Sequence, residues 1–599
     1  MGHNPTGVKR LSDKMHGKTH IASAGLIQSD RNTPRGGGST MSGDKFRFPE
    51  MGPHAIKPWA VRKGYADEHF LSDYRYQFPR EDPALPEVFV YTEKMSYDPG
   101  EAVEFHGSTT ARTWSIQIYR DGHKPQMMDE AFELPGSFTK TSETAFMDGC
   151  DWPVLYRWKI PDDARSGFYR VVSTCLRPDG ERFVQHHFVV VRPTRKTRSG
   201  RILLMFATGT WTAYNDWGGA NHYFGTWGPN KNEGSPVLSL KRPWSKGMIW
   251  LPKGAGRVTN ATWQDMGDAT RYPSKEWGYT MGFSQYYSSA GYAQYERHFV
   301  TWAEAEGFQI DYITQTDLHY NPSILDDYNC LVTVGHDEYW SWDMRKTVED
   351  FVARGGHLAR FGGNFLWQIR LENDGQTQVC WKTKAPTQDP IMQTDQKHLC
   401  TANWASGAVN WPGASTVGVN GENGMYGSWG GFSPRGSRGL TVYRPDHWAF
   451  EGTHLRYADI FGHEAQIFGY EVDGLNYTIQ NGFPYAVSEH GVPADKIEIL
   501  AMTPASIYEY EIEGEGQRYY IRDSDLRGIC EMAPDGYESA RKRLAHGAGI
   551  LVSMTQGKGE VVTAGLCEWV MGLKRHCDFT TTITRNVLDR FQQSGPAGT

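Results

Sequence analysis

The chain has few cysteines, no long apolar run and no excess of basic residues. Its eight cysteines are spread over 599 residues without a Cys-x-x-Cys pair, which argues against zinc-ribbon and thioredoxin-like motifs. No apolar segment approaches the roughly 20 residues of a membrane-spanning helix, and the N-terminus lacks the apolar core of a secretory signal. The net charge of −7 excludes a basic nucleic-acid footprint. We therefore expect a cytoplasmic protein that binds neither nucleic acid nor membrane. Its thiols are expected to be buried, and one disulfide, between Cys380 and Cys400, is kept as an alternative.

The common catalytic motifs are also missing. There is no G-x-S-x-G nucleophile elbow, no Walker A loop and no cysteine in a G-x-C-x-G turn, which disfavours serine hydrolases, nucleotide hydrolases and cysteine glutaminases. An H-E-x-x-H zinc motif is absent, because Ile467 follows His463-Glu464 where the second histidine would stand. The chemistry must therefore be sought in residues that the fold brings together.

The pattern along the chain predicts a multidomain protein. Residues 1–84 are polar or irregular and predict a flexible arm followed by a surface segment. Short strands separated by turns predict a β-sandwich over 85–194. Residues 200–599 predict an α/β domain, with insertions at about 245–290 and 370–450 that are rich in glycine and aromatic residues.

Apolar runs in the α/β domain predict buried strands that alternate with helices. We expect a helix over 296–306 and a second helix that Ser341 caps and Gly355-Gly356 ends. Right-handed crossovers between such strands produce an open, mostly parallel sheet. A final helix is expected over about 582–591. The strands are expected at 202–206, 309–313, 330–334, 357–361, about 464–470 and 559–564.

Polar side chains follow the predicted parallel strands. Because the carboxyl ends of parallel strands share one edge of a sheet, these side chains should gather there. They are Tyr214, Asp317, His319, His336, Asp337, Glu338 and Asn364. Carboxylate, imidazole, phenol and amide groups suit metal binding and acid–base chemistry, but the pattern alone does not select a reaction.

Five stretches of the sequence resemble the large (β) subunit of the N,N-dimethylformamidase family. The most specific is His336-Asp337-Glu338-Tyr339-Trp340, and the likeness extends over roughly 85–595. The other four are 213–219 (AYNDWGG), 362–367 (GGNFLW), 469–474 (GYEVDG) and 583–589 (ITRNVLD). This resemblance implies a β-sandwich followed by a domain shaped like the class I glutamine amidotransferases. It also implies large assemblies that include a small partner subunit.

The resemblance further implies a mononuclear iron, held by two tyrosines and a glutamate, that hydrolyses N-substituted amides. Glu338 matches the glutamate ligand and Tyr214 one tyrosine, and by spacing we take Tyr169 as the second. His336 matches the histidine beside the iron, and Asn364 and Glu471 match further polar residues of the active site. The remaining rivals for the second tyrosine are Tyr272, Tyr279, Tyr286 and Tyr292. Two phenolates and a carboxylate form a hard, anionic ligand set that suits Fe(III).

Three functional hypotheses follow. The first is an iron-dependent amidohydrolase for a small N-alkylated amide such as N,N-dimethylformamide. The second is a hydrolase of the same family whose substrate is a bulkier amide, because the 245–290 segment reshapes the site. The third is a non-catalytic member that binds a carbohydrate or a protein through its aromatic-rich loops.

Overall fold

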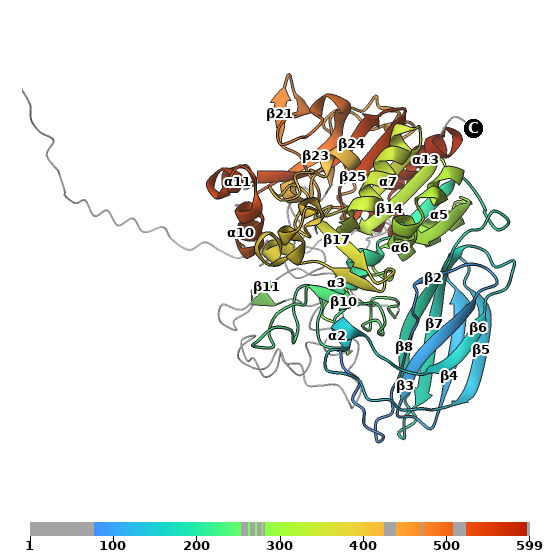
Figure 1. Cartoon of the computed structure of the whole chain (residues 1–599). Helices are drawn as coiled ribbons and strands as arrows, with labels where there is room; N and C mark the ends of the chain where they lie inside the picture. The colour runs from blue at the N-terminus through green and yellow to red at the C-terminus, as the bar shows by residue number, and fades with distance from the viewer. Residues whose placement is uncertain are drawn as a thin grey trace, which may run out of the picture. The chain divides into compact units, whose positions relative to one another are not determined.

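A computed structural model shows the helices and strands of the described residues (Figure 1). It describes residues 77–252, 255, 262–263, 270–271, 278, 282–424, 439–468, 471–506, 523–544 and 546–595. Contacts within the chain divide it into residues 1–47 and residues 48–599. The predicted arm and most of the predicted surface segment lie outside the described residues, and only residues 77–84 of that segment are described. Among the helices described, none combines the length and the apolar character needed to cross a membrane.

The first part of the described chain forms two facing β-sheets. A three-stranded sheet has the order β1 (Val88–Tyr91), β3 (Ala102–Thr109) and β6 (Val154–Lys159). The second sheet has the order β2 (Ser96–Tyr97), β8 (Arg182–Val191), β7 (Gly167–Leu176), β4 (Thr113–Arg120) and β5 (Gln126–Pro135). Strands β3 and β4 largely alternate buried with more exposed residues, so each turns one face inward. Phe105 from one sheet and Ile116 from the other share a core, which fits the predicted β-sandwich.

A nine-stranded sheet dominates the rest of the chain. Its order is β13 (Ile310–Thr314), β9 (Ile202–Phe206), β14 (Cys330–His336), β16 (His357–Gly363), β25 (Gly559–Ala564), β24 (His546–Gln556), β23 (Ile497–Ser506), β19 (Leu440–Val442) and β20 (Ile460–Phe461). The pairs from β13 to β25 are parallel, as the apolar runs predict. The pairs from β25 to β20 are antiparallel. The sheet is therefore mixed.

Two expectations about this sheet need correction. It is not mostly parallel, because the long strands β23 and β24 enter it antiparallel, and an apolar run shows burial without showing strand direction. The strand expected at about 464–470 is not found in the described part, where Glu464–Gln466 lie in turns and residues 469–470 lie outside the description. The likeness to the glutamine amidotransferases stays a prediction.

The predicted helices pack on the parallel strands. Helix α7 (Trp342–Ala353) begins after Ser341, whose hydroxyl accepts a hydrogen bond from the Met344 amide at 3.2 Å, and it ends before Gly355-Gly356. Helices α5 (Glu296–Ala305) and α13 (Asp578–Gln593) confirm the two other helix predictions. The buried face of α13 includes Ile583 and Val587, as expected for a helix covering a sheet.

A small sheet extends the segments that leave β14 and β16. Its order is β10 (Val237–Ser239), β18 (Thr377–Val379), β17 (Trp367–Glu372) and β15 (Tyr339–Ser341). Strand β18 and the last residues of β17 belong to the insertion that the sequence predicts at about 370–450, and β19 of that region joins the main sheet. Part of the predicted insertion therefore pairs with strands of the two sheets. It fixes the chain on both sides of the residues at the sheet edge.

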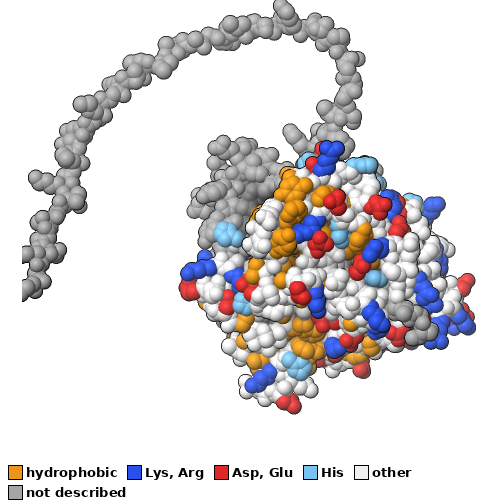
Figure 2. Space-filling model, turned by 90° about the horizontal axis from the view of Figure 1, so that it is seen from above, with side chains coloured by type: hydrophobic (Ala, Val, Ile, Leu, Met, Phe, Trp, Pro, Cys, Tyr) orange, Lys and Arg blue, Asp and Glu red, His pale blue; other side chains and the backbone are white. Residues whose placement is uncertain are grey.

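The cysteines are all free. Seven are buried and Cys577 is half-buried, so the Cys380–Cys400 bridge is not formed. The thiol of Cys380 instead lies 3.6 Å from the Gln368 carbonyl oxygen. On the face seen in Figure 2, acidic and basic side chains are interspersed among hydrophobic ones over the residues that the structure describes, in keeping with the near balance of charges in the sequence.

Candidate active site

The site lies at the carboxyl ends of β14 and β16. His336 is the last residue of β14, Glu338 lies between β14 and β15, and Asn364 directly follows β16. Tyr214 is the last residue of α3 (Thr208–Tyr214), the helix that follows β9. Glu471 comes from a loop much later in the chain. The five residues are all less than 9% exposed, so the structure brings most of the predicted site residues into one buried cluster.

His336 stands between two carboxylates. Its Nδ1 lies 2.7 Å from the Ser289 carbonyl oxygen, which requires Nδ1 to carry a proton and to donate it. Its Nε2 lies 2.6 Å from Oε2 of Glu471 and 3.2 Å from Oε2 of Glu338. The ring is therefore arranged to hold a second proton on Nε2, shared between two acidic groups.

Glu338 binds a tyrosine that the sequence did not single out. The Tyr223 hydroxyl lies 2.8 Å from Oε2 and 2.9 Å from Oε1 of Glu338, and 2.8 Å from the Tyr339 hydroxyl. The Tyr214 ring packs against Tyr223, with ring centroids 4.5 Å apart. Phenol and carboxylate oxygens therefore converge at one point, which is the donor set that a hard cation prefers.

A tight turn explains why Tyr214 and Tyr223 meet. The Asn221 amide group donates to the Tyr214 carbonyl at 3.1 Å, and its oxygen accepts from the Tyr223 backbone amide at 2.8 Å. A bridge between Ala220 and Gly225 closes the same turn. Asn221 is a frequent turn residue, so the sequence offers a weak signal for the turn and none for the direction of the Tyr223 side chain.

A lysine lies over the Tyr223 ring. The ammonium nitrogen of Lys382 is 3.2 Å from the centre of this ring and 5.0 Å from the centre of the Trp367 ring. Lys382 itself adopts a left-handed backbone conformation with φ of 53°. A cation on the face of a phenol favours negative charge on its oxygen, so Lys382 adds to the electrostatics of the site.

Asn364 joins the two carboxylate-bearing segments. Its side-chain nitrogen donates to Oε2 of Glu471 at 2.7 Å and lies 3.1 Å from Nε2 of His336. The backbone of Asn364 has φ of 66°, a conformation that asparagine tolerates better than most residues. The strand β16 ends in Gly362-Gly363, and this left-handed residue then turns its side chain into the site.

A buried ion-pair network lies behind the site. Arg360 in β16 donates to Oδ2 of Asp473 at 2.7 Å, and its Nε lies 3.5 Å from Oδ2 of Asp337. All three side chains are fully buried. Because Asp337 precedes Glu338 and Asp473 follows Glu471 by two residues, this network fixes the segments of Glu338 and Glu471 relative to β16. Removing one partner would leave an uncompensated buried charge.

The charges of the cluster shift its pKa values in different directions. Burial opposes the imidazolium form of His336, but Glu471 and Glu338 outweigh burial and raise its pKa to about 10. Burial would raise the pKa of Glu338, yet the hydrogen bond and charge of His336 bring it below the usual range. The pKa of Glu471 is raised by burial and by the charge of Glu338, although His336 opposes this. Burial and Glu338 raise the pKa of the Tyr223 phenol well above 10.

Comparison with known families identifies the relationship. A family model described as N,N-dimethylformamidase beta subunit-like, C-terminal, matches residues 115–579, which is more than half of the chain. The chain belongs to this family. The N,N-dimethylformamidase beta subunits of Paracoccus aminophilus and of an Alcaligenes species are each 21% identical to it over 75% of this chain. The match covers 56% of each relative, so the chain spans about half the length of these curated proteins.

Two solved structures match short parts of the chain. The sporulation control protein Spo0M from Bacillus subtilis is 18% identical over 18% of this chain and 50% of its own chain, with a TM-score of 0.14. A structure of murine CRIg is 11% identical over 18% of this chain and 98% of its own, with a TM-score of 0.13. Likenesses at this level carry no argument about the site.

The structure does not bring Tyr169 to the cluster. This residue lies in strand β7 of the sandwich, where its hydroxyl donates to the Arg165 carbonyl at 2.7 Å and its ring packs against Trp158. The expectation that Tyr169 is the second ligand has no support in this geometry, because the inward face of a sandwich strand points to the sandwich core and not to the sheet edge. Tyr223 occupies the position beside Glu338 instead.

The other candidate residues have separate places. Tyr286 packs near Tyr214 with ring centroids 5.7 Å apart, whereas Tyr292 stacks on Phe168 at 3.6 Å in the main core. Tyr272 and Tyr279 lie outside the described residues.

Asp317 and His319 belong to the scaffold. Asp317 caps the short helix α6 (Gln315–Tyr320) and accepts hydrogen bonds from Ser96 at 2.5 Å and Arg192 at 3.0 Å, both in the sandwich part of the chain. His319 lies 2.8 Å from the hydroxyl of Ser341. Both side chains therefore position elements around the site and do not enter the cluster.

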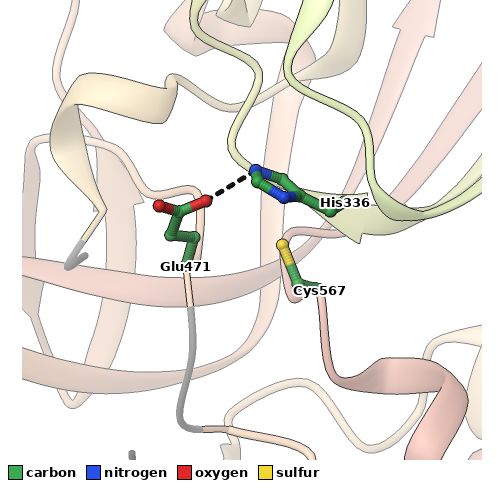
Figure 3. Close-up of side chains that lie close together, drawn as sticks. All are labelled: His336, Glu471 and Cys567. Carbon is green, nitrogen blue, oxygen red and sulfur yellow. Dashed lines mark ion pairs between the residues drawn. The ribbon is translucent and has the colours of Figure 1, made fainter. Parts of the chain in front are cut away.

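Cys567 completes the inner wall of the cluster. Ligand atoms of His336, Glu471 and Cys567 all lie within 4.8 Å of one another, and all three residues are buried (Figure 3). Burial and the neighbouring carboxylates, Glu471 first among them, raise the pKa of the Cys567 thiol well above 9. The sequence predicts only a buried thiol at this position, because nothing in the local pattern brings residue 567 next to residue 336.

Proposed function

We propose that the chain is the catalytic part of an iron-dependent amidohydrolase. It would cleave the C–N bond of a small N-alkylated amide, such as N,N-dimethylformamide, to a carboxylic acid and an amine. The observation that carries this proposal is the meeting of Tyr223, Glu338 and His336 at one sheet edge in a chain of this family. The burial of the cluster favours a small substrate over a bulky one.

Tyr214, Tyr223 and Glu338 are the residues that we propose to hold the iron. Oxygen ligands about 2.0–2.2 Å from one cation lie roughly 3 Å apart, and the Tyr223 and Glu338 oxygens are 2.8–2.9 Å apart. The set is hard and anionic, which fits Fe(III). Since the pKa of Tyr223 is raised, only a strong Lewis acid would hold it as a phenolate at neutral pH. When bound, iron would polarise the amide carbonyl and lower the pKa of water.

The remaining polar residues divide the proton transfers between them. His336 holds a proton on Nε2 and can give it to the leaving amine, because its pKa is raised to about 10. Glu471, whose pKa is raised toward neutrality, is placed to accept a proton from the attacking water. Asn364 donates to Glu471 at 2.7 Å and so orients this base.

We also propose that the protein acts in an assembly. The two curated relatives are named beta subunits, and the chain spans about half their length. An oligomer that includes a small partner subunit, with no nucleic-acid or membrane partner, is the arrangement that follows from this relationship.

Metal content and amide hydrolysis test the proposed function. The full chain should be purified without a chelating tag, alone and with a co-expressed small subunit where one exists. About one iron per chain with a visible phenolate-to-iron absorption, together with amine release from N,N-dimethylformamide, would support the proposal. Hydrolysis of bulkier amides only would favour the second hypothesis. A zinc in place of iron would contradict the Tyr214–Tyr223–Glu338 set. Absence of metal, with full tolerance of changes at Glu338, would favour a binding protein.

A further inference from the structure

We propose that His336, Glu471 and Cys567 form a second metal site, which takes a thiophilic divalent cation such as Zn²⁺, Co²⁺ or Cd²⁺. The three side chains come from three distant segments and turn their ligand atoms toward a common point (Figure 3). This site shares no ligand with the all-oxygen set of Tyr214, Tyr223 and Glu338, although Nε2 of His336 lies 3.2 Å from Oε2 of Glu338. It therefore stands or falls independently of the proposed iron.

The backbone around Gly363 holds the three residues together. Gly363 pairs with His336 in the register of β14 and β16. A Cβ atom on Gly363 would lie 3.0 Å from Sγ of Cys567 and 2.7 Å from the Glu471 carbonyl oxygen, so only glycine leaves room here. The Cys567 amide donates to this same carbonyl at 3.2 Å, and Val472 bridges Leu566 next to it. Backbone pairing thus places His336, and the bridge between Val472 and Leu566 ties the loop of Glu471 to the segment of Cys567.

The chemistry of the three groups matches a borderline or soft cation. Thiolate, imidazole and carboxylate are the usual protein ligands of zinc. In a tetrahedral site these ligand atoms lie roughly 3.3–3.8 Å apart. The present atoms lie within 4.8 Å of one another, so shifts of the side-chain atoms by about 1 Å would bring them to these separations. The thiolate and the carboxylate together neutralise a divalent charge. Binding would release the thiol proton of Cys567 and the Nε2 proton of His336 to water, with no oxidation or reduction.

The site has a route to solvent and a consequence for the reaction. The Glu471 side chain is 11% exposed, whereas that of His336 is 0%, so a cation would enter from the side of Glu471. Once bound there, it would occupy the two groups that the proposed hydrolysis uses for proton transfer. A thiophilic cation should therefore inhibit an iron-loaded enzyme without displacing the iron.

Cobalt absorption tests the proposal directly. Co²⁺ is added to the full chain after a chelator has removed bound metal, and the near-ultraviolet thiolate-to-cobalt absorption is recorded. We expect this absorption in wild type and in Cys577→Ser, a matched control at the half-buried cysteine. We expect it to be lost in Cys567→Ala and in Cys567→Ser, with circular dichroism and thermal unfolding confirming that both variants fold.

Each other outcome overturns the second site. Cobalt that binds without thiolate absorption would belong to oxygen ligands only, and absorption that persists in Cys567→Ala would come from another thiol. If neither Cys567 variant folds, X-ray absorption at the cobalt edge of wild type decides, because the site requires one sulfur ligand at about 2.3 Å. None of these results bears on iron binding or amide hydrolysis, which are measured separately by iron content and amine release.

Discussion

The β-sandwich and the edge of the nine-stranded sheet both bury polar side chains, but they pair them differently. In the sandwich, Tyr169 donates to the neutral carbonyl of Arg165. At the sheet edge, Tyr223 donates to the carboxylate of Glu338. Burial of a tyrosine is therefore no sign of function by itself. The charge of its partner separates a satisfied core residue from a candidate ligand.

Two histidines repeat the same contrast. His187 in the sandwich is fully buried beside the Thr92 hydroxyl at 2.9 Å, and burial lowers its pKa to about 3, so it stays neutral. His336 is just as buried, yet Glu471 and Glu338 outweigh burial and raise its pKa to about 10. Burial acts in the same direction on both rings. Only the carboxylates of the sheet edge reverse its effect and produce a site able to move protons.

The largest difference between the two regions is expected on loss of Glu338. Glu338→Ala removes the carboxylate that binds Tyr223 and faces His336, so we expect loss of bound iron and a fall in turnover of about 10³-fold or more. The matched control is Glu130→Ala on the exposed face of the sandwich, which should keep both. Metal analysis and amine release measure the two effects. Retention of iron and turnover by Glu338→Ala would refute the ligand assignment.

The second largest difference is expected in how the free energy of unfolding changes with pH, which depends on Glu296 in the α/β part and on His187 in the sandwich. Burial raises the pKa of Glu296, the first residue of helix α5, from 4.5 to about 8. The folded state then binds this proton more tightly than the unfolded state. The associated stability is present below pH 4.5 and is lost as the pH rises to about 8, by on the order of a few kcal/mol.

Denaturant unfolding across this range checks the effect. Glu296→Gln should lose less stability with rising pH than wild type does, since an amide does not ionise. His187→Gln should leave the slope above pH 6.5 unchanged, because the stability linked to His187 is lost only as the pH falls from 6.5 to about 3. Parallel curves for wild type and Glu296→Gln would show that Glu296 is ionised in the folded protein.

The two tyrosines offer a direct exchange test. Tyr223→Phe removes the hydroxyl beside Glu338, and we expect a loss of phenolate-to-iron absorption and about 10²-fold lower turnover. Tyr169→Phe removes a hydrogen bond inside the sandwich and should cost about 1 kcal/mol of stability with turnover unchanged. Spectra, kinetics and thermal unfolding of both variants decide between them. The reverse pattern would restore Tyr169 as the ligand.

The smallest effect is expected at Lys382. Lys382→Met removes the cation above the Tyr223 ring, so the phenol should ionise less readily and turnover should fall by about tenfold. The control is Lys384→Met, whose ammonium lies over Trp227 at 5.9 Å and pairs with Glu233. A pH titration of the tyrosinate absorption measures the shift. Equal behaviour of the two variants would limit Lys382 to a packing role.

Much of the architecture around the site is predictable from local patterns. The apolar runs that become β9, β13, β14 and β16 are read correctly because buried parallel strands need apolar residues on both faces. Helix α7 follows its cap at Ser341 for an equally local reason. Strands β23 and β24 escape prediction, since their antiparallel pairing depends on the partner strand and not on their own residues.

The sequence by itself determined the parallel strands and the helices that cover them, and it placed His336, Glu338 and Asn364 at strand ends, because periodicity and caps act over a few neighbouring residues. It could not select the tyrosine that faces Glu338. Tyr223 and Glu338 are 115 residues apart, and their contact arises when a turn and two strands close around the sheet edge. Only the tertiary structure decided this pairing and the approach of Cys567 to His336. Local sequence patterns do not determine contacts between residues more than a hundred positions apart in the chain.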